Sequence, residues 1–127
     1  MPTIAIVGAG PDRRKFANKC VRAYRAADWT VFPIHPAADI VEGLAVHRTL
    51  AEVPLEHIDR VSVYLPPAAG LAALDTFTGK SIGELWLNPG ADAPEVVAKA
   101  RSMGFEVICD CSILAIGYSP SQFDESV

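Results

Sequence analysis

Short apolar runs alternate with amphipathic stretches along the whole chain. The runs are rich in Val, Ile, Leu and aromatic residues and are bounded by turn residues, so they predict strands at 3–7, 30–34, 60–65, 84–87 and 106–110. The stretches between them predict helices over residues 14–28, 68–79 and 94–103. A short helix is expected near residues 49–53, with Thr49 as N-cap and Glu52 as its capping-box partner.

The predicted strands are nearly continuous apolar runs, which is typical of parallel strands covered on both faces. We therefore expect an α/β fold, a doubly wound, Rossmann-like parallel sheet of about five strands with right-handed crossovers. One face of the helix over 14–28 is expected to point inward, and it carries Phe16, Cys20, Ala23, Tyr24 and Ala27. In the last segment, Ile113, Leu114 and Ile116 are expected to pack.

The chain has 127 residues, which suits one domain over 1–127, with a core of about 3–117 and a mobile tail over 118–127. The formal net charge of -4 argues against nucleic acid as the main partner. No apolar run approaches the ~18 residues of a membrane span and no signal-peptide pattern is present, so we expect no membrane partner and a cytoplasmic protein. Its cysteines, Cys20, Cys109 and Cys111, fit reduced thiols, and Cys109-x-Cys111 is too short for a zinc site.

The first predicted strand leads into a glycine turn and then into a basic helix start. The turn is Gly8-Ala9-Gly10-Pro11, and Arg13, Arg14 and Lys15 follow it. Glycines let the backbone approach an anionic group, and the start of a helix offers unpaired N–H groups and the positive end of its dipole. The sequence therefore predicts a phosphate-binding turn, while most basic residues of the helix itself are expected on its solvated face.

Every predicted strand ends in a loop of rigid or polar residues. Because the carboxyl ends of parallel strands lie along one edge of the sheet, these loops are expected to converge on a binding crevice. In chain order the loops are Gly8-Ala9-Gly10-Pro11, Pro33-Ile34-His35-Pro36, Tyr64-Leu65-Pro66-Pro67, Asn88-Pro89-Gly90 and Cys111-Ser112.

The pattern of a dinucleotide site is incomplete. In the G-x-G-x-x-G fingerprint, Arg13 stands where the third glycine belongs. The second strand ends in Ile34-His35-Pro36, without the acidic residue that holds the ribose of NAD, and Asp39 lies too far along the chain to replace it. No Gly-Lys-Ser/Thr completes a Walker A loop. An NAD(P)-binding oxidoreductase-type domain is therefore the disfavoured alternative.

Seven segments, in this order and spacing, carry a resemblance to a known family: Val7-Gly8-Ala9, Lys15-Phe16-Ala17-Asn18-Lys19, Val31-Phe32-Pro33-Ile34-His35-Pro36, Glu42-Gly43, Val63-Tyr64-Leu65-Pro66-Pro67, Trp86-Leu87-Asn88-Pro89-Gly90 and Cys111-Ser112-Ile113. Over about residues 3–120 the chain resembles the CoA-binding domain family, small Rossmann-like proteins similar to the nucleotide-binding domain of the succinyl-CoA synthetase α subunit.

The resemblance implies coenzyme A or an acyl-CoA as the ligand. The turn from Gly8 to Pro11 would take the diphosphate, as the dipole argument also requires. The remaining residues that the resemblance assigns fall into four groups: Lys15 and Lys19 with Arg13 or Arg14 for the diphosphate or the 3′-phosphate, with Phe16 between the two lysines; Pro33, Ile34 and Pro36 for the adenosine end; Tyr64, Leu65, Pro66 and Pro67 for an apolar wall; and Asn88, Pro89 and Gly90 for the pantetheine amides.

Two positions depart from the family pattern, in which Ser is common at Gly10 and Asn at His35. A neutral imidazole still donates one hydrogen bond, so we interpret His35 as a ligand contact or a packed residue rather than as a general base. Cys111 is the one nucleophile within reach of a ligand thiol, although a buried structural role is favoured.

These observations favour a non-catalytic binding or regulatory module over an enzyme, because no acid–base pair is evident. A partner that supplies CoA to an acyl-transfer enzyme is a further alternative. A homodimer, or association with an enzyme that uses acyl-CoA, is possible as well.

Overall fold

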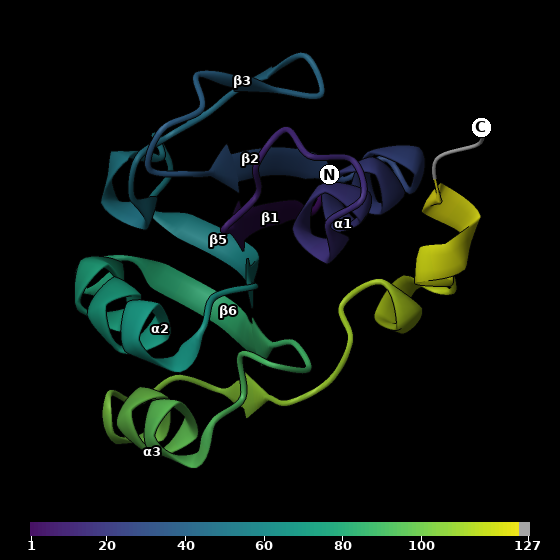
Figure 1. Ribbon diagram of the computed structural model, residues 1–127. Coiled ribbons are helices and arrows are strands. Elements are labelled where there is room, and N and C mark those ends of the chain that lie inside the picture. The colour runs from purple at the N-terminus through teal and green to yellow at the C-terminus, as the bar shows by residue number, and fades with distance from the viewer. Residues whose placement is uncertain (125–127) are drawn as a thin grey trace.

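The structure, a computed structural model, describes residues 1–124, and its central element is a parallel sheet in the order β2-β1-β5-β6-β7. The strands are β1 (Thr3–Val7), β2 (Thr30–Ile34), β5 (His57–Val63), β6 (Ser81–Leu87) and β7 (Val107–Ile108). All of their pairings are parallel. The predicted α/β doubly wound fold is therefore confirmed (Figure 1).

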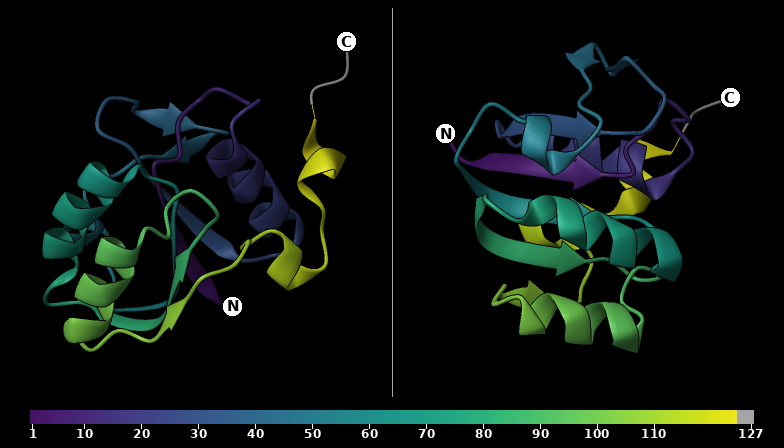
Figure 2. Two further views of the ribbon diagram at one scale, coloured as in Figure 1. Left: turned by 60° about the horizontal axis from the view of Figure 1, so that its bottom comes forward. Right: turned by 90° about the vertical axis from the view of Figure 1, so that its left-hand side faces the viewer.

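Helices cover both faces of this sheet. The helix α1 (Phe16–Ala26) lies on one face, and α2 (Pro67–Leu74) and α3 (Pro94–Ser102) lie side by side on the other (Figure 2, left). Proline stands in the first turn of α2 and of α3, where its missing N–H costs no hydrogen bond. The two faces have separate apolar cores: one includes Phe77 and Leu85, and the other includes Ile4 of β1 and Tyr24 of α1.

Beside the second core an arginine of β5 lies between two aromatic rings. The Arg60 guanidinium carbon is 5.0 Å from the Trp29 ring centroid and 4.7 Å from that of Trp86. Arg60 also donates a 3.0 Å hydrogen bond to the Tyr24 hydroxyl and pairs with Glu84 at 2.9 Å. This half-buried charge is therefore held by cation–π contacts and by hydrogen bonds at once.

Several predicted boundaries were wrong at the element ends. β5 begins at His57 rather than 60 and ends at Val63, β6 begins at Ser81 rather than 84, and β7 keeps only two residues of the expected 106–110. The helix expected over 14–28 spans Phe16–Ala26, and that expected over 94–103 spans Pro94–Ser102. The helix expected over 68–79 ends at Leu74 and continues as the 3-10 turn η2 (Asp75–Phe77).

The segment between β2 and β5 contains elements that the sequence did not predict. A two-stranded antiparallel hairpin, β3 (Ile40–Val41) with β4 (Leu44–Ala45), turns at two residues of positive φ, Glu42 and Gly43. The short helix expected at 49–53 is the 3-10 turn η1 (Leu50–Glu52).

The predicted capping box at the start of η1 was wrong. The Thr49 side chain makes no cap hydrogen bond. The Glu52 carboxylate accepts from the backbone N–H of Arg48, at 2.7 Å, instead of from that of Thr49.

Two apolar residues expected to pack are exposed. Phe16, the first residue of α1, is 60% exposed and lines two surface hollows instead of packing on the sheet. Leu114, 57% exposed, lies in the 3-10 turn η3 (Leu114–Ile116), whereas Ile113 is fully buried as expected.

The last described segment runs beside α1. The 3-10 turn η4 (Pro120–Phe123) follows Tyr118, and the Tyr118 and Phe123 rings pack edge to face at 5.5 Å. Asp124 forms an ion pair with Lys19 of α1. The rest of the predicted mobile tail, 125–127, lies outside the described residues.

Candidate functional site

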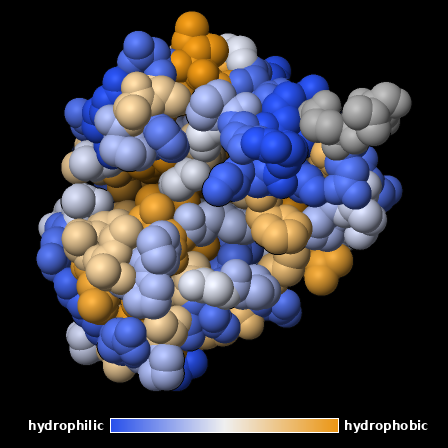
Figure 3. Space-filling view, in the orientation of Figure 1, coloured by the Kyte–Doolittle hydropathy of each residue, from blue (hydrophilic) through white to orange (hydrophobic). Residues whose placement is uncertain are grey.

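The loops at the carboxyl edge of the sheet enclose three adjoining hollows. The central hollow has a volume of about 500 Å³. Its lining includes Gly8, Gly10, Pro11, Lys15 and Phe16 from the first turn and helix, and Tyr64, Leu65, Pro66, Pro89 and Gly90 from two later loops. In Figure 3 a furrow with apolar atoms in it separates the part of the surface that carries β3 from the part that carries α2.

The two smaller hollows share residues with the central one. The β2 hollow, about 320 Å³, shares Gly8 and Leu65 with it, and its lining includes Ile34, His35, Pro36 and Arg48 and several apolar residues of α2. The Cys111 hollow, about 220 Å³, shares Phe16, Tyr64 and Pro89 with it and is completed by Asn88, Cys111, Ile113 and Pro120. The three hollows therefore form one trough along the carboxyl edge of the sheet.

Most residues that the sequence assigned to the site line this trough, but six line none of the three hollows: Ala9, Arg13, Arg14, Lys19, Pro33 and Pro67. Ala9 and Pro33 are buried in the sheet and its first turn, and Pro67 begins α2. Their predicted ligand contacts stay predictions.

The first turn requires glycine at its start. Gly8 has a φ of +96°, and a Cβ there would lie 2.6 Å from the backbone oxygen of Tyr64. The Gly8 and Ala9 N–H groups both donate to the Ile34 carbonyl, at 2.9 and 3.1 Å. The turn is thereby fixed between the ends of β2 and β5, and it passes the sheet edge without a side chain in the way.

A buried asparagine of α1 forms a hydrogen bond with the same turn. Asn18, fully buried in α1, donates from Nδ2 to the Gly10 carbonyl at 3.0 Å and to the Glu42 carboxylate at 3.2 Å. Its Oδ1 accepts from Arg22 at 2.9 Å. In the sequence, Asn18 stood out only as part of a segment that resembles the family. In the structure, its side chain positions the turn.

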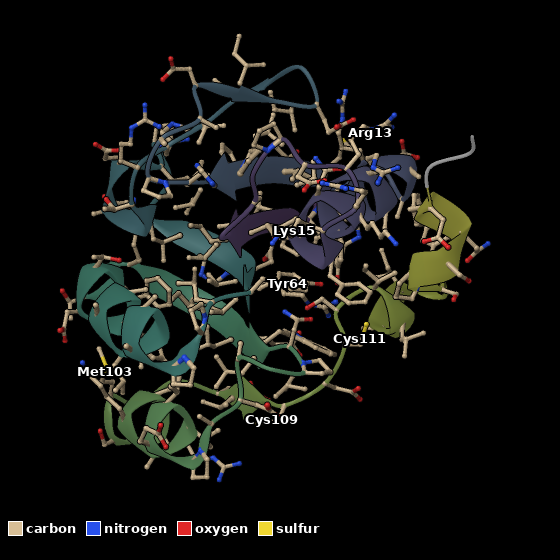
Figure 4. The ribbon with its side chains drawn as sticks, viewed as in Figure 1. Arg13, Lys15, Tyr64, Met103, Cys109 and Cys111 are labelled. Atoms are coloured by element: carbon tan, nitrogen blue, oxygen red, sulfur yellow. The ribbon has the colours of Figure 1, made fainter. Side chains whose placement is uncertain are left out.

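The basic residues near the turn are not equivalent. Lys15 lines the central hollow, whereas Arg13 lies at the outer edge, where it pairs with Glu42 at 3.3 Å (Figure 4). Arg14 pairs with Asp12, and hydrogen bonds from Arg14 lower the pKa of Asp12 to about 2. Lys19 is mostly buried and pairs with Asp124. Of these cations, Lys15 is the one placed to meet an anion in the central hollow.

His35 occupies the space beside Gly10. Its Nδ1 accepts from the backbone N–H groups of Ala37 and Ala38, at 3.1 and 3.0 Å. In the neutral ring the proton then resides on Nε2. A Cβ on Gly10 would lie 3.0 Å from that Nε2. The two departures from the family pattern are therefore coupled, because the imidazole fills the room that a side chain at Gly10 would need.

Arg48 is the cation of the β2 hollow, and the sequence did not indicate it. Its Nη1 donates to the carbonyls of His35 and Ala38, at 3.2 and 2.5 Å, and its Nη2 donates to Asp39 at 2.6 Å. These bonds bring the guanidinium back to the end of β2 from a loop 13 residues later in the chain. Such a return path follows from tertiary structure and leaves no local signal in the sequence.

Asn88 is committed to the protein rather than open to a ligand. The residue is 1% exposed, and its Nδ2 donates to Ser62 Oγ at 2.8 Å and to the Val63 carbonyl at 2.9 Å. Its Oδ1 accepts from the buried Ser112 N–H at 2.8 Å. The side chain therefore ties the loop after β6 to the end of β5 and to the segment after β7, and its amide has no free donor for the pantetheine amides.

Tyr64 and the cysteines differ widely in environment. The Tyr64 oxygen is buried and has no hydrogen-bond partner within residues 1–124, and burial raises the pKa of Tyr64. Burial also raises the pKa of the fully buried Cys20 thiol to about 12. Cys109 is exposed, while the partly exposed Cys111 faces its hollow across from Tyr64 (Figure 4).

No three His, Cys, Asp or Glu side chains in the described part of the chain are grouped to hold a metal ion. Within residues 1–124, the helices fall short of the length and apolarity that a membrane crossing requires.

The parallel sheet with helices on both faces is a Rossmann-like fold, and comparison with known proteins identifies the family. A family profile described as "CoA binding domain" matches residues 2–117. The chain therefore belongs to the CoA-binding domain family, as its resemblance predicted. No curated protein matches it.

Solved structures share the fold. A conserved hypothetical protein from Pyrococcus furiosus is 25% identical with a TM-score of 0.79, over 91% of this chain and 99% of that one. A Thermus thermophilus protein is 23% identical with a TM-score of 0.82, over 97% and 90%. An acetyl-coenzyme A synthetase of Ca. Korarchaeum cryptofilum, solved with phosphate and ADP, is 24% identical with a TM-score of 0.72, over 85% of this chain but only 25% of its own length.

Proposed function

We propose that this chain binds coenzyme A or an acyl-CoA along the three-hollow trough, as a binding or regulatory module. The observation that carries the proposal is the continuity of the trough, since each smaller hollow shares lining residues with the central one. An elongated ligand with an anionic diphosphate at its centre fits this order. Membership of the CoA-binding domain family supports the same ligand.

In this arrangement the diphosphate lies in the central hollow, against the Gly8–Pro11 turn and Lys15. The adenosine lies in the β2 hollow, between Pro36 and the apolar face of α2. The pantetheine arm passes Tyr64 and Pro89 toward Cys111. Asn88 acts by fixing the loop that carries Pro89, in place of the direct amide contact expected from the sequence.

Arg48 gives the β2 hollow a means to recognise the 3′-phosphate, which distinguishes CoA from NAD and from dephospho-CoA. Its guanidinium is anchored to two backbone carbonyls, and its side chain is 42% exposed and lines the hollow. Asp39, its present partner, is 86% exposed and can turn to solvent when a phosphate arrives. An arginine fixed in this way suits a phosphate, because its planar donors match the phosphate oxygens.

The lining of the trough supports a binding role rather than a catalytic one. Within residues 1–124, the trough offers no base held by a carboxylate: the His35 Nδ1 is taken by backbone N–H groups and Asp12 is paired with Arg14. General acid–base catalysis needs a proton-transfer group that is oriented and free to exchange a proton. Binding alone, for regulation or for supply of CoA to an acyl-transfer enzyme, requires no such proton-transfer group.

Thermal unfolding of the purified chain with CoA, dephospho-CoA and NAD tests the proposal. We expect stability to rise with CoA concentration, by about 2.7 kcal/mol at 100 times the Kd. NAD is expected to have little effect. A shift with NAD and none with CoA would show that the family ligand has been exchanged in this chain.

The Arg48 assignment is tested by the ratio of the CoA and dephospho-CoA affinities. We expect Arg48→Gln to lower this ratio by about tenfold, because one charge-assisted contact is lost. Arg101→Gln, on the exposed surface of α3, serves as a matched charge control and should leave the ratio unchanged. An unchanged ratio in Arg48→Gln would show that Arg48 does not contact the 3′-phosphate, and it would leave the proposal of CoA binding intact.

A further inference from the structure

The Cys111 hollow lies beyond the part of the trough that a diphosphate needs. It adjoins the central hollow through Phe16, Tyr64 and Pro89, and its far side is formed by Cys111, Ile113 and Pro120. Ile113 is fully buried, and Pro120 belongs to η4, which packs beside α1. The hollow is thus one end of the trough, and the proposed arrangement of CoA directs the thiol end of the ligand toward it.

The lining of this hollow is neutral. Among residues 1–124, its lining consists of aromatic, proline and aliphatic side chains, with the Tyr64 hydroxyl, Asn88 and Cys111 as the polar groups. The Asn88 amide is fully engaged with Ser62, Val63 and Ser112, so it does not solvate an occupant. A carboxylate entering this hollow would lose hydration and meet no cationic side chain in the lining, which is costly.

The volume fits a chain of a few carbons. An apolar cavity of roughly 150 Å³ accepts a molecule the size of benzene. At about 220 Å³, the Cys111 hollow has room for somewhat more than that. A bare thiol would leave most of the hollow empty, and filling apolar space gains both dispersion and hydrophobic free energy.

We propose that the Cys111 hollow is an acyl subsite, which selects CoA thioesters of neutral, short-to-medium acyl groups over free CoA and over dicarboxylic acyl-CoAs. This inference rests on the proposed function and deepens it, because it names the form of the ligand. The acyl group extends from the pantetheine sulfur past Tyr64 and ends against Ile113 and Pro120.

A series of ligands measured by titration calorimetry tests the subsite: CoA, acetyl-, butyryl-, hexanoyl-, succinyl- and palmitoyl-CoA. Affinity is expected to rise by about twofold to fourfold per added carbon from acetyl- to hexanoyl-CoA. Palmitoyl-CoA should gain nothing further, because its chain exceeds the hollow. Butyryl- and succinyl-CoA have equal chain lengths, and the succinyl form should bind at least about tenfold more weakly.

Cys111→Phe fills the hollow, so it should reduce the ratio of butyryl-CoA to CoA affinity to about one. Cys109→Phe places the same bulk on an exposed position two residues away and should leave the ratio as in the parent. If circular dichroism shows that Cys111→Phe is unfolded, Phe16→Ala replaces it, since it removes an aromatic ring from the lining that the Cys111 hollow shares with the central hollow and should lower the same ratio.

The outcomes separate the two proposals. Equal affinities for CoA and butyryl-CoA, or tighter binding of succinyl-CoA than of butyryl-CoA, would overturn the acyl subsite and leave CoA binding intact. A failure of every compound to bind would overturn the proposed function and the subsite with it.

Discussion

Gly10 and His35 lie against each other at the turn after β1, and a double-mutant cycle measures how strongly the two residues are coupled. A Cβ at residue 10 would lie 3.0 Å from His35 Nε2 and 3.1 Å from its Cδ2. The imidazole cannot easily yield, because two backbone N–H groups hold its Nδ1. Gly10→Ala should therefore be harmful only while His35 is present.

The effect of Gly10→Ala on the free energy of unfolding has two opposing parts. Overpacking of this kind costs about 1–2 kcal/mol at a partly exposed site. Gly→Ala also stabilises by about 0.4–1 kcal/mol through the unfolded chain, but this gain is the same in both backgrounds and cancels in the cycle. In His35→Asn, the amide oxygen can still accept from Ala37 and Ala38 while the ring is gone. We expect a coupling of about 1–2 kcal/mol.

Urea unfolding of the four proteins measures the free energies. Gly70→Ala provides the matched control: Gly70 lies in α2, where an added Cβ would meet Val96 side-chain carbons at an ordinary 3.6 Å. Its effect should simply add to that of His35→Asn. Additivity of Gly10→Ala with His35→Asn, to within about 0.5 kcal/mol, would refute the shared space.

Two further predictions concern the buried network and the thiols. Asn88→Ala should lower the free energy of unfolding by about 2–4 kcal/mol, since it strands the buried Ser112 N–H and removes two donated hydrogen bonds; a loss under about 1 kcal/mol in a urea titration would contradict this account. With Ellman's reagent at pH 8, Cys109 should react first and Cys20 only on unfolding, because Cys20 is buried and its pKa, raised to about 12, keeps it a thiol far above that pH. Mass spectrometry identifies which cysteine has reacted. Rapid reaction of Cys20 in the folded protein would show that the core beneath α1 opens.

Strand centres were readable from the sequence, while their ends were not. Apolar runs such as Ile4–Val7 recur because both faces of a parallel strand are buried, and the fold class follows from their alternation with helices. The first residues of β5 and β6, His57 and Ser81, are polar and exposed, and hydrogen bonding rather than burial places them in the sheet. Strands as short as β3 and β4 are too brief to show a period at all.

The site was predictable only where it follows the sheet edge. The loops after β1, β2, β5, β6 and β7 could be brought together because topology alone makes them neighbours. The pairing of Lys19 with Asp124, across 105 residues, and the return of Arg48 to His35 depend on the paths of loops. Side-chain pairings of this kind have no sequence period, and they decide which cations face the trough.

Both tryptophans of the chain stack on one guanidinium, that of Arg60. Neither Trp29 nor Trp86 lines any of the three hollows. The intrinsic fluorescence of this protein therefore reports the integrity of the β2, β5 and β6 framework and carries little information on ligand occupancy. Because the tryptophans lie outside the hollows, tryptophan fluorescence can be used to follow unfolding in the presence of an acyl-CoA.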